Sequence, residues 1–231
     1  MTERRLYERV DKMSIGILGG TGPAGKALAT RLASLGIDVR IGSRQQERAT
    51  EIVAALGEKW PGRSLSLTGV TNEEACEADL VVVATPWDGA APTISALADR
   101  LAGKVVISMA NALQKVGDEL QALVPPRGSI TVAVQQAAPD AFVAGAFHHV
   151  PARGLANLEE SLDADVLVCS DHERAITATI ELVDAIPGLR GVDAGSLSSA
   201  GAIEAFTAVL VGINIKHRAH ASIRLTGFKD S

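Results

Sequence analysis

Three glycines near the start of the chain have the spacing of a phosphate-binding turn. Gly20, Gly22 and Gly25 fit the pattern G-x-G-x-x-G within the stretch GGTGPAG. In such a turn the first glycine permits a tight bend, the second lets the backbone approach a pyrophosphate, and the third lets a helix pack closely on a strand. The helix that follows would offer its unpaired N–H groups to the anion. The spacing therefore predicts a dinucleotide-binding turn.

The residues around this turn have the order that a dinucleotide-binding unit needs. The apolar run SIGIL, residues 14–18, predicts a strand directly before the turn, and residues 26–28 (KAL) open a helix after it. Pro23 costs little near the helix start, because the N–H that it lacks would have no intrahelical partner. A glycine-rich turn without a ligand is the alternative, but the strand–turn–helix–strand order favours the dinucleotide.

The end of the second predicted strand carries a hydroxyl and cations where NAD enzymes commonly carry a carboxylate. That carboxylate binds the ribose 2′-hydroxyl and would repel a 2′-phosphate. The stretch VRIGSR instead ends in Ser43 and Arg44, and Arg48 lies one helical turn further on. Arginine binds phosphate through two parallel hydrogen bonds. An exposed arginine beside Ser43 as a helix cap is the alternative; we favour a site for the 2′-phosphate of NADP.

The ends of the fourth and fifth predicted strands should complete the site. They are ATPW, residues 84–87, and SMAN, residues 108–111. Ligands of open α/β sheets bind outside the carboxyl ends of the strands, so these stretches are expected to line the nicotinamide pocket. Trp87 offers a planar ring there, although it could instead cover the core beneath the next helix.

Two adjacent histidines, His148 and His149, lie in FHHVPA at the expected end of the sixth strand. Neighbouring residues of a strand point to opposite faces, so one ring should face the cleft and the other the scaffold, and the pair should not share a metal ion. A lone histidine is more often structural than catalytic. Cys76 and Cys169 lack metal or redox spacing and are expected to be buried, small apolar residues. No metal site is predicted.

The sequence lacks the patterns of several other enzyme classes. It has no Ser-His-Asp triad pattern, no His-Glu-x-x-His and no P-loop. This fits a hydride-transfer enzyme, in which the cofactor supplies the chemistry while the protein sets the distance and the reacting face.

The elements that must position these residues alternate along the chain. Short Val/Ile/Leu runs alternate with longer Ala-rich segments of helical period, which predicts a buried parallel sheet. Strands are predicted at residues 14–19, 39–42, 66–70, 80–85, 105–109, 142–148, 166–169 and 190–193. Helices are predicted at residues 24–35, 46–56, 72–78, 89–101, 113–124, 129–138, 172–185 and 203–217. The expected fold class is α/β: a Rossmann-type doubly wound, mostly parallel sheet with a smaller C-terminal α/β part.

We expect three parts along the chain. They are an N-terminal extension (1–13), an NADP-binding Rossmann domain (14–150) and a small C-terminal domain (151–231) with the acceptor site and a possible dimer contact. Residues 202–215 form a predicted helix that is apolar almost all round, with Glu204 and Thr207 as interruptions. Such a helix needs cover on most of its surface, either inside the small domain or in a dimer interface.

The composition narrows the partners and the location. The 231 residues are 47% apolar and carry a net charge of −5, which gives no electrostatic reason to expect nucleic acid. The first dozen residues are charged and lack the apolar core of a signal peptide. No apolar run reaches the roughly 18 residues that a membrane helix needs. We therefore expect a cytoplasmic protein without a membrane partner.

Seven stretches of the sequence resemble, in order, those of one family. They are GGTGPAGKALATRLASLG, VRIGSR, ATPW, FHHVPA, DADVLVCSD, VDAGSLSSAGAIEAFTAVLVGIN and HASIRLTG. Over nearly everything after Met13, the chain is similar to the NADPH-dependent reductases of coenzyme F420. The resemblance implies a dimer that exchanges a hydride between C4 of the NADP nicotinamide and C5 of the 5-deazaflavin. Reduction of a flavin or quinone, or NADP sensing without turnover, are the alternatives.

The resemblance also implies roles for individual residues. His148 and Thr207 match positions near the deazaflavin, where either could polarise the acceptor ring. Together with the motif residues above, the positions expected to bind NADP are Gly20, Thr21, Gly22, Pro23, Ala24, Gly25, Ser43, Arg44, Arg48, Thr85, Pro86, Trp87, Met109, Ala110 and Ala152.

The C-terminal segment departs from the family in two positions. Gly201 and Ala205 stand where family members often carry Arg and Ser, which could weaken deazaflavin binding or change the acceptor. A basic cluster lies at and after the end of the predicted helix at residues 203–217. It either holds the anionic tail of the deazaflavin or complements the dipole of that helix. This cluster consists of Lys216, His217, Arg218, His220 and Arg224.

Overall fold

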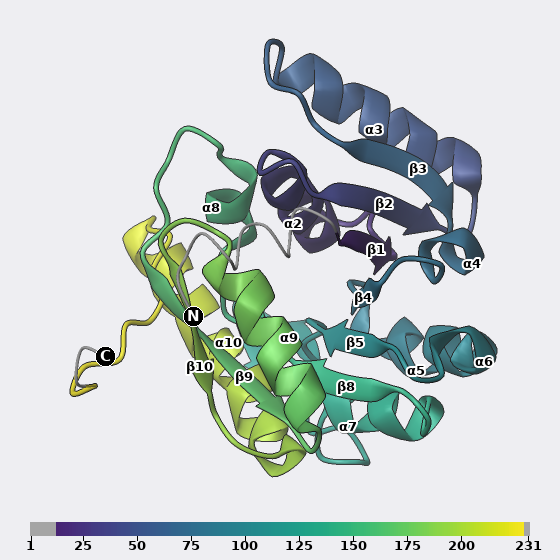
Figure 1. The fold of residues 1–231 in the computed structure, drawn as a ribbon. Helices are drawn as coiled ribbons and strands as arrows, with labels where there is room; N and C mark the ends of the chain where they lie inside the picture. Colours follow the sequence, from purple (N-terminus) through teal and green to yellow (C-terminus); the bar gives the residue numbers. More distant parts are fainter. Residues whose placement is uncertain (1–12, 229–231) are drawn as a thin grey trace.

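The computed structural model describes residues 13–228, and its centre is an eight-stranded sheet (Figure 1). The strand order is β10-β9-β8-β5-β4-β1-β2-β3. The paired strands are parallel except β8 and β9, which run antiparallel. The strands are β1 (Ser14–Leu18), β2 (Asp38–Ser43), β3 (Leu67–Thr71), β4 (Leu80–Val83), β5 (Val105–Ser108), β8 (Phe142–Gly145), β9 (Ala164–Ser170) and β10 (Leu189–Asp193).

Helices cover both faces of this sheet because alternate strand residues point to opposite sides. Leu80 and Val82 of β4 pack in one apolar layer, and Val81 and Val83 pack in the other. The first layer includes residues of α2 (Pro23–Ala33), α3 (Gln46–Lys59), α8 (Ala152–Ala156) and α9 (Glu173–Asp184). The second includes residues of α4 (Asn72–Ala75), α5 (Trp87–Ala96), α6 (Ala98–Leu101) and α7 (Ile130–Ala137).

The chain changes direction between β1 and β4, which lie side by side in the sheet. From β1 it winds outward through β2 to β3, then returns to β4 and winds the other way. This is the doubly wound, mostly parallel sheet that the alternating pattern predicts, so the fold class is confirmed. The C-terminal strands β9 and β10 extend the same sheet. The division of the chain near residue 150 stays a prediction, and the expected extension lies outside the described residues except for Met13.

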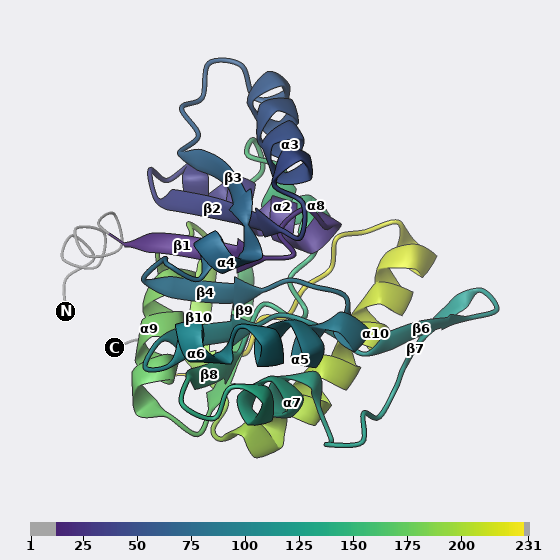
Figure 2. The same ribbon diagram turned by 90° about the vertical axis from the view of Figure 1, so that its right-hand side faces the viewer.

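Residues 113–124, predicted as a helix, form a hairpin instead. Its strands are β6 (Leu113–Val116) and β7 (Glu119–Ala122), which pair antiparallel. The two residues between them are Gly117 and Asp118, and Gly117 has a φ of +60°, which favours glycine. A two-residue turn of this kind joins antiparallel strands. Figure 2 shows the hairpin reaching out beside α10 (Ala200–His217).

The sixth strand of the sheet, β8, ends at Gly145 and not at residue 148. Phe147 has a φ of +62° and is buried, which turns the chain out of the extended conformation. His148 and His149 therefore lie in a turn, and the expectation that they continue the strand is wrong.

The long helix α10 places two of its polar residues inside and several apolar ones outside. Glu204 and Thr207 are buried, whereas Val209 is 54% exposed and Phe206 and Ile213 are also exposed. By length and composition alone the segment Leu197–His217 is long and apolar enough to span a membrane, so the expectation that no apolar run reaches this length is wrong, and 28% of its most apolar part is buried. The hydrogen bonds of Glu204 and Thr207, described below, hold this helix against the body of the protein.

Candidate functional site

The glycine turn between β1 and α2 is built so that two of its glycines serve the fold. A Cβ on Gly20 would lie 2.8 Å from the Ile17 carbonyl oxygen, and one on Gly25 would lie 2.8 Å from Gly20 Cα. Gly22 differs, since the nearest atom to its Cβ would be the Gly19 carbonyl oxygen at 3.6 Å. Packing within the chain therefore does not require glycine at position 22. The motif predicts that a ligand approaches the backbone at this position.

The first turn of α2 is left open at this point. Gly22 is its N-cap and makes no side-chain capping bond, and Pro23 opens the helix. The first N–H groups of a helix have no intrahelical partner and carry the positive end of its dipole. This helix end can therefore bind a phosphate without displacing a bond of the protein.

Asn72, which no sequence pattern marked, holds the start of this turn. Its Oδ1 accepts a hydrogen bond from the Gly19 N–H at 3.2 Å, and its side chain is buried. The same oxygen would lie 2.9 Å from a Cβ on Gly42, at the end of β2. Thr71 and Glu74 form a capping box that fixes α4, and hence Asn72, at its N-terminus. Asn72 thus ties the glycine turn to β2.

The end of β2 presents two arginines to solvent. Arg44 and Arg48 are exposed, and neither forms an ion pair with any residue from 13 to 228. Ser43 is buried and accepts a hydrogen bond from the Gln45 N–H at 3.3 Å. The N-cap of α3 is Gln45, so the alternative in which Ser43 caps this helix is wrong. Both guanidinium groups remain available to an anion.

The carboxyl ends of β4 and β5 and the turn after β8 carry buried polar groups without partners. Thr85 Oγ1, Ser108 Oγ and both ring nitrogens of His148 have no hydrogen-bond partner among the described residues. Ser108 pairs in register with Val83 on one side and Gly145 on the other, so these strand ends are neighbours. Buried polar groups are normally paired, and leaving one unpaired costs about 1–3 kcal/mol. Ligands of open α/β sheets bind at this edge and would pair such groups.

His148 is neutral at ordinary pH. Burial, with a smaller contribution from His149, lowers the pKa of His148 to about 3. The nearby backbone of Ala110 and Met109 opposes this only in part, and neither residue forms a well-aligned hydrogen bond with the ring. The neutral ring can donate one hydrogen bond and accept one. His149 Nε2 lies 2.9 Å from the Asp165 carbonyl oxygen, so this second ring is held by the scaffold. No group of side chains within residues 13–228 has the geometry of a metal site.

Thr207 lies beside His148, but its hydroxyl contacts the backbone. Thr207 Oγ1 is 3.1 Å from the His148 carbonyl oxygen and 3.3 Å from Asn111 Oδ1, so it can donate to either. Asn111, which the sequence did not single out, donates from Nδ2 to the same His148 carbonyl at 2.9 Å. These two side chains fix the turn that carries His148. The structure thus brings the two predicted catalytic residues together.

Glu204, one turn before Thr207 on α10, caps the neighbouring helix α7. Its carboxylate accepts hydrogen bonds from the Ile130 N–H (2.8 Å), the Thr131 N–H (2.9 Å) and the Thr131 hydroxyl (2.8 Å). Burial raises the pKa of Glu204, although these three bonds act in the opposite direction. Gly201 lies close by, and a Cβ on it would be 2.7 Å from the Gly128 carbonyl oxygen. Gly201 is one of the two positions at which the sequence departs from the family, and packing against Gly128 requires a glycine there.

Arg31 connects the glycine turn to the segment that carries Ala152. From the last turn of α2, its guanidinium donates to the carbonyls of Leu155 (3.1 Å), Gly154 (2.8 Å) and Asn157 (2.5 Å). These carbonyls end α8, and Ala152 begins it. Arg31 therefore positions Ala152 relative to α2.

The remaining predicted positions lie on the elements expected of them. Met109 and Ala110 are buried directly after β5. Thr85 and Pro86 follow β4, and Trp87, 37% exposed, opens α5. Cys76 and Cys169 are buried free thiols, as expected, and burial raises the pKa of each to about 11.

The basic cluster after α10 is not one surface group. Arg224 is paired with Asp163 at 2.6 Å and with the buried Asp165 at 2.9 Å. Lys216, His217, Arg218 and His220 are exposed. Arg224 thus anchors the C-terminal segment, and Lys216 and Arg218, beside two exposed histidines, remain as the cations of this cluster that could meet a ligand.

A doubly wound sheet with an open glycine turn, an uncapped helix end and two free arginines defines a dinucleotide-binding protein of the Rossmann type. A family model described as "NADP oxidoreductase coenzyme F420-dependent" matches residues 14–112. The chain is 37% identical over 223 residues to the F420-dependent NADP reductase of Methanocaldococcus jannaschii, covering 94% of this chain and 100% of that protein. The chain belongs to the family of F420-dependent NADP reductases.

A second relative agrees with this assignment, and a solved structure shares the fold. The F420-dependent NADP reductase of Methanothermobacter thermautotrophicus is 33% identical over 231 residues, covering 96% of this chain and 98% of that protein. A crystal structure from Arthrobacter sp. FB24 has the same fold, with a TM-score of 0.76 and 23% identity over 93% of this chain and 100% of that chain.

Proposed function

We propose that this protein is an oxidoreductase that transfers a hydride between NADP(H) and coenzyme F420. The observation that carries the proposal is the space at Gly22. A Cβ there would meet no close atom of the protein, so the fold does not require this glycine, whereas a cofactor pyrophosphate close to the backbone would. The family supports the choice of both cofactors. When bound, NADPH supplies a hydride from its nicotinamide and the deazaflavin accepts it.

The residues of the chain would then bind and orient the cofactor. Residues 20–25 and the open end of α2 hold the pyrophosphate through backbone N–H groups. Ser43, Arg44 and Arg48 hold the 2′-phosphate, which two free guanidinium groups favour over the plain ribose of NAD. Positions 85–87, 109–110 and 152 lie around the nicotinamide.

His148 and Thr207 would act on the acceptor side. A neutral His148 can polarise the acceptor ring through a hydrogen bond without adding charge, which its lowered pKa supports. The Thr207 hydroxyl donates a hydrogen bond to the His148 carbonyl, so Thr207 acts as a positioning residue for the turn that carries His148. The C-terminal residues 151–231 would form a small domain with the acceptor site.

The acceptor is tested by mixing the protein with NADPH and oxidised F420 and following the deazaflavin absorbance. Bleaching with F420 but not with a flavin nucleotide or a quinone supports the proposal. Reduction of only the flavin or the quinone would contradict it and would point to the changes at Gly201 and Ala205. Tight NADPH binding with no turnover of any acceptor would identify an NADP sensor instead.

The preference for NADP is tested by Arg44→Asp. We expect KM for NADPH to rise and the preference for NADPH over NADH to fall by about tenfold or more, since one phosphate contact of this kind contributes about 1.5–3 kcal/mol. Arg127→Asp makes the same charge change at an exposed position away from β2 and is the control. An unchanged NADPH/NADH preference in Arg44→Asp would refute the assignment.

We also propose a cytoplasmic homodimer that uses the exposed face of α10. Phe206, Val209 and Ile213 are exposed on this helix although they are apolar, as expected for a surface that a second copy covers. Val209→Glu should give a monomer in light scattering, whereas Ala54→Glu on α3 should leave the mass unchanged. A monomeric wild type would contradict the dimer. We expect no nucleic-acid or membrane partner.

A further inference from the structure

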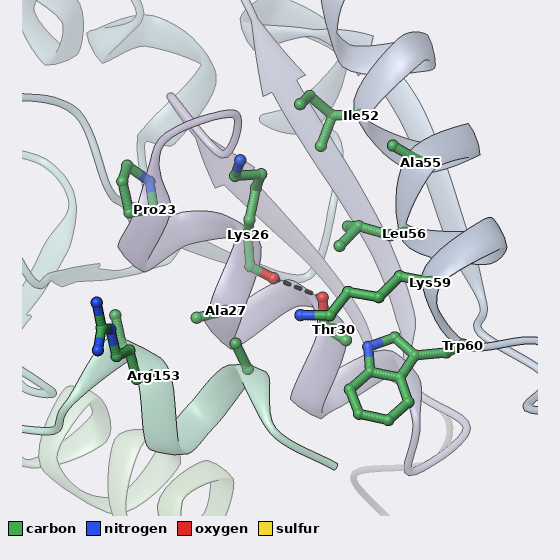
Figure 3. A pocket seen from close by; sticks show the side chains of 12 residues that line it. Pro23, Lys26, Ala27, Thr30, Ile52, Ala55, Leu56, Lys59, Trp60 and Arg153 are labelled. Atoms are coloured by element: carbon green, nitrogen blue, oxygen red, sulfur yellow. Dashed lines mark hydrogen bonds between the residues drawn. The ribbon is translucent and has the colours of Figure 1, made fainter. Parts of the chain in front are cut away.

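A pocket of about 380 Å³ lies between α2, α3 and α8, on the helix layer beside the sheet (Figure 3). We propose that this pocket is a second ligand site, which binds a small organic anion with an apolar ring or chain. Its volume falls within the roughly 300–1,000 Å³ range of small-molecule sites. The proposal rests on the charge of its rim, the chemistry of its floor and its place outside the carboxyl edge of the strands.

The rim of the pocket is positively charged. Lys26 comes from α2, Lys59 from α3 and Arg153 from α8, and none of them forms an ion pair with another described residue. The lining residues include no carboxylate. Lys59 extends from α3 toward Thr30 on α2, and the three cations come from three different helices (Figure 3). In a protein with a net charge of −5, three unpaired cations around one cavity favour an anionic ligand.

The floor of the pocket is apolar and includes one aromatic ring. Ala27, Ile52, Leu56 and Trp60 line it. The indole Nε1 of Trp60 is buried without an acceptor in the described part of the chain, and a ligand oxygen could accept its hydrogen bond. The Lys59 ammonium lies 5.5 Å from the centre of the Trp60 ring, so charge and apolar surface meet at one point.

These two features together select the class of ligand. An inorganic anion would contact the cations but leave the floor exposed to water. A neutral apolar molecule would cover the floor but leave the cations unpaired. A carboxylate, sulfonate or phosphate attached to a ring or short chain satisfies both, and it also gives the Trp60 N–H an acceptor.

The pocket lies next to the proposed dinucleotide site and is separate from it. The expected NADP positions follow the carboxyl ends of the strands. The pocket instead extends along the sides of α2 and α3, as far as Lys59 and Trp60 at the end of α3. Only the helix starts, at Pro23 and Ala152, belong to both linings. A ligand in the pocket should therefore bind together with NADP⁺ and not compete with it.

The test uses 8-anilinonaphthalene-1-sulfonate, a naphthalene ring system with one sulfonate. The chain has two tryptophans, so Trp87→Phe leaves Trp60 as the reporter. We expect saturable quenching of Trp60 emission with a stoichiometry of one. Lys59→Glu should weaken binding by about fivefold, the effect of one partly exposed ion pair, and Leu56→Glu should weaken it further. N-phenyl-1-naphthylamine, the analogue without the sulfonate, should bind more weakly.

Controls separate this site from others on the protein. Lys216→Glu, at the exposed end of α10, should not change the affinity for the probe. In the wild-type protein, which keeps Trp87, saturating NADP⁺ should leave the fluorescence of the bound probe unchanged, and circular dichroism should show that each variant is folded. The proposal is overturned if quenching does not saturate, if Lys59→Glu has no more effect than Lys216→Glu, or if NADP⁺ displaces the probe. None of these outcomes depends on turnover of F420.

Discussion

Replacing Gly25 by alanine should damage the fold more than the cofactor site. The new Cβ would lie 2.8 Å from Gly20 Cα and 3.1 Å from Ala84 Cβ, and the first of these atoms is backbone that cannot rotate away. Overpacking of this kind costs about 1–3 kcal/mol. The better helix propensity of alanine returns at most about 1 kcal/mol. We therefore expect Gly25→Ala to lower the free energy of unfolding by about 1–2 kcal/mol.

Gly22→Ala should have the opposite profile. The nearest atom to its Cβ is 3.6 Å away, an ordinary contact, and its φ of −74° and ψ of 166° suit alanine. The free energy of unfolding should stay within about 0.5 kcal/mol of the wild type. The methyl group would, however, occupy space over the open end of α2. We expect affinity for NADP⁺ to fall by at least about tenfold, or about 1.4 kcal/mol.

Two measurements distinguish these outcomes. Urea unfolding followed by circular dichroism gives the stability of each variant, and calorimetric titration gives its affinity for NADP⁺. A folded Gly22→Ala protein that binds NADP⁺ as tightly as the wild type would refute the assignment of the pyrophosphate to this turn. Equal destabilisation by the two substitutions would show that the difference in contact distance does not determine their effects.

Three further predictions concern buried polar groups. The folded-state pKa of His148, about 3, lies below its ordinary value of 6.5, so the unfolded chain binds an extra proton and stability falls as the pH drops below about 6.5. Between pH 7 and pH 5 the free energy of unfolding, measured with urea, should fall by about 2 kcal/mol because of His148. The variant His148→Gln should lack this decrease, and the control variant His217→Gln, changed at an exposed site, should still show it. Arg31→Met should lower the free energy of unfolding by about 2–4 kcal/mol, because three carbonyls lose a charged donor; an unchanged urea midpoint would contradict this. Glu204→Gln should lower the free energy of unfolding by about 1–3 kcal/mol, since the amide NH₂ would face a backbone N–H, and a urea midpoint equal to that of the wild type would contradict this.

The elements that sequence predicted well are those in which local pattern and tertiary environment agree. The continuous apolar runs of β4 and β5 are buried on both faces, so burial alone identifies them as strands of a parallel sheet. The glycine turn is equally local, because strand, turn and helix lie within residues 14–33. The order of these elements then allows few topologies other than a doubly wound sheet.

The hairpin at residues 113–122 shows where local pattern fails. Leu, Gln, Lys and Glu are good helix formers, and the segment contains all of them. The structure is decided by Gly117 and Asp118, which form the two-residue turn, and by the packing of β7 against α10. The second cause involves residues far away in the sequence, so a window on residues 113–124 cannot show it.

The hydrogen bonds of the site that the sequence did not predict join similarly distant residues. Asn72 bonds to Gly19, 53 positions away, and Asn111 bonds to the His148 carbonyl, 37 positions away. An isolated asparagine after a strand or at a helix start indicates a turn or a cap, and nothing in its neighbours shows a bond to another loop. The positive φ of Phe147 depends on tertiary structure in the same way, and it moved both histidines off the strand.

The distribution of satisfied and unsatisfied buried polar groups supports the placement of both proposed sites. Arg31, Glu204 and Asp165 are buried, and each is hydrogen-bonded through several atoms, as expected where polar groups join elements of a fold. Among residues 13–228, by contrast, the buried atoms of Thr85, Ser108 and His148 that lack a partner lie at the carboxyl edge of the sheet, and that of Trp60 lies in the pocket between α2 and α3. Single atoms of His149, Thr179 and Ser222 also lack a partner and belong to neither site. Such groups cost stability unless something pairs them. If NADP⁺ and the deazaflavin pair the first set, their binding should stabilise the protein beyond the effect of the phosphate contacts alone. The adenosine 2′,5′-bisphosphate half of NADP⁺ would then raise the melting temperature less than whole NADP⁺ does, with both ligands present at the same free concentration.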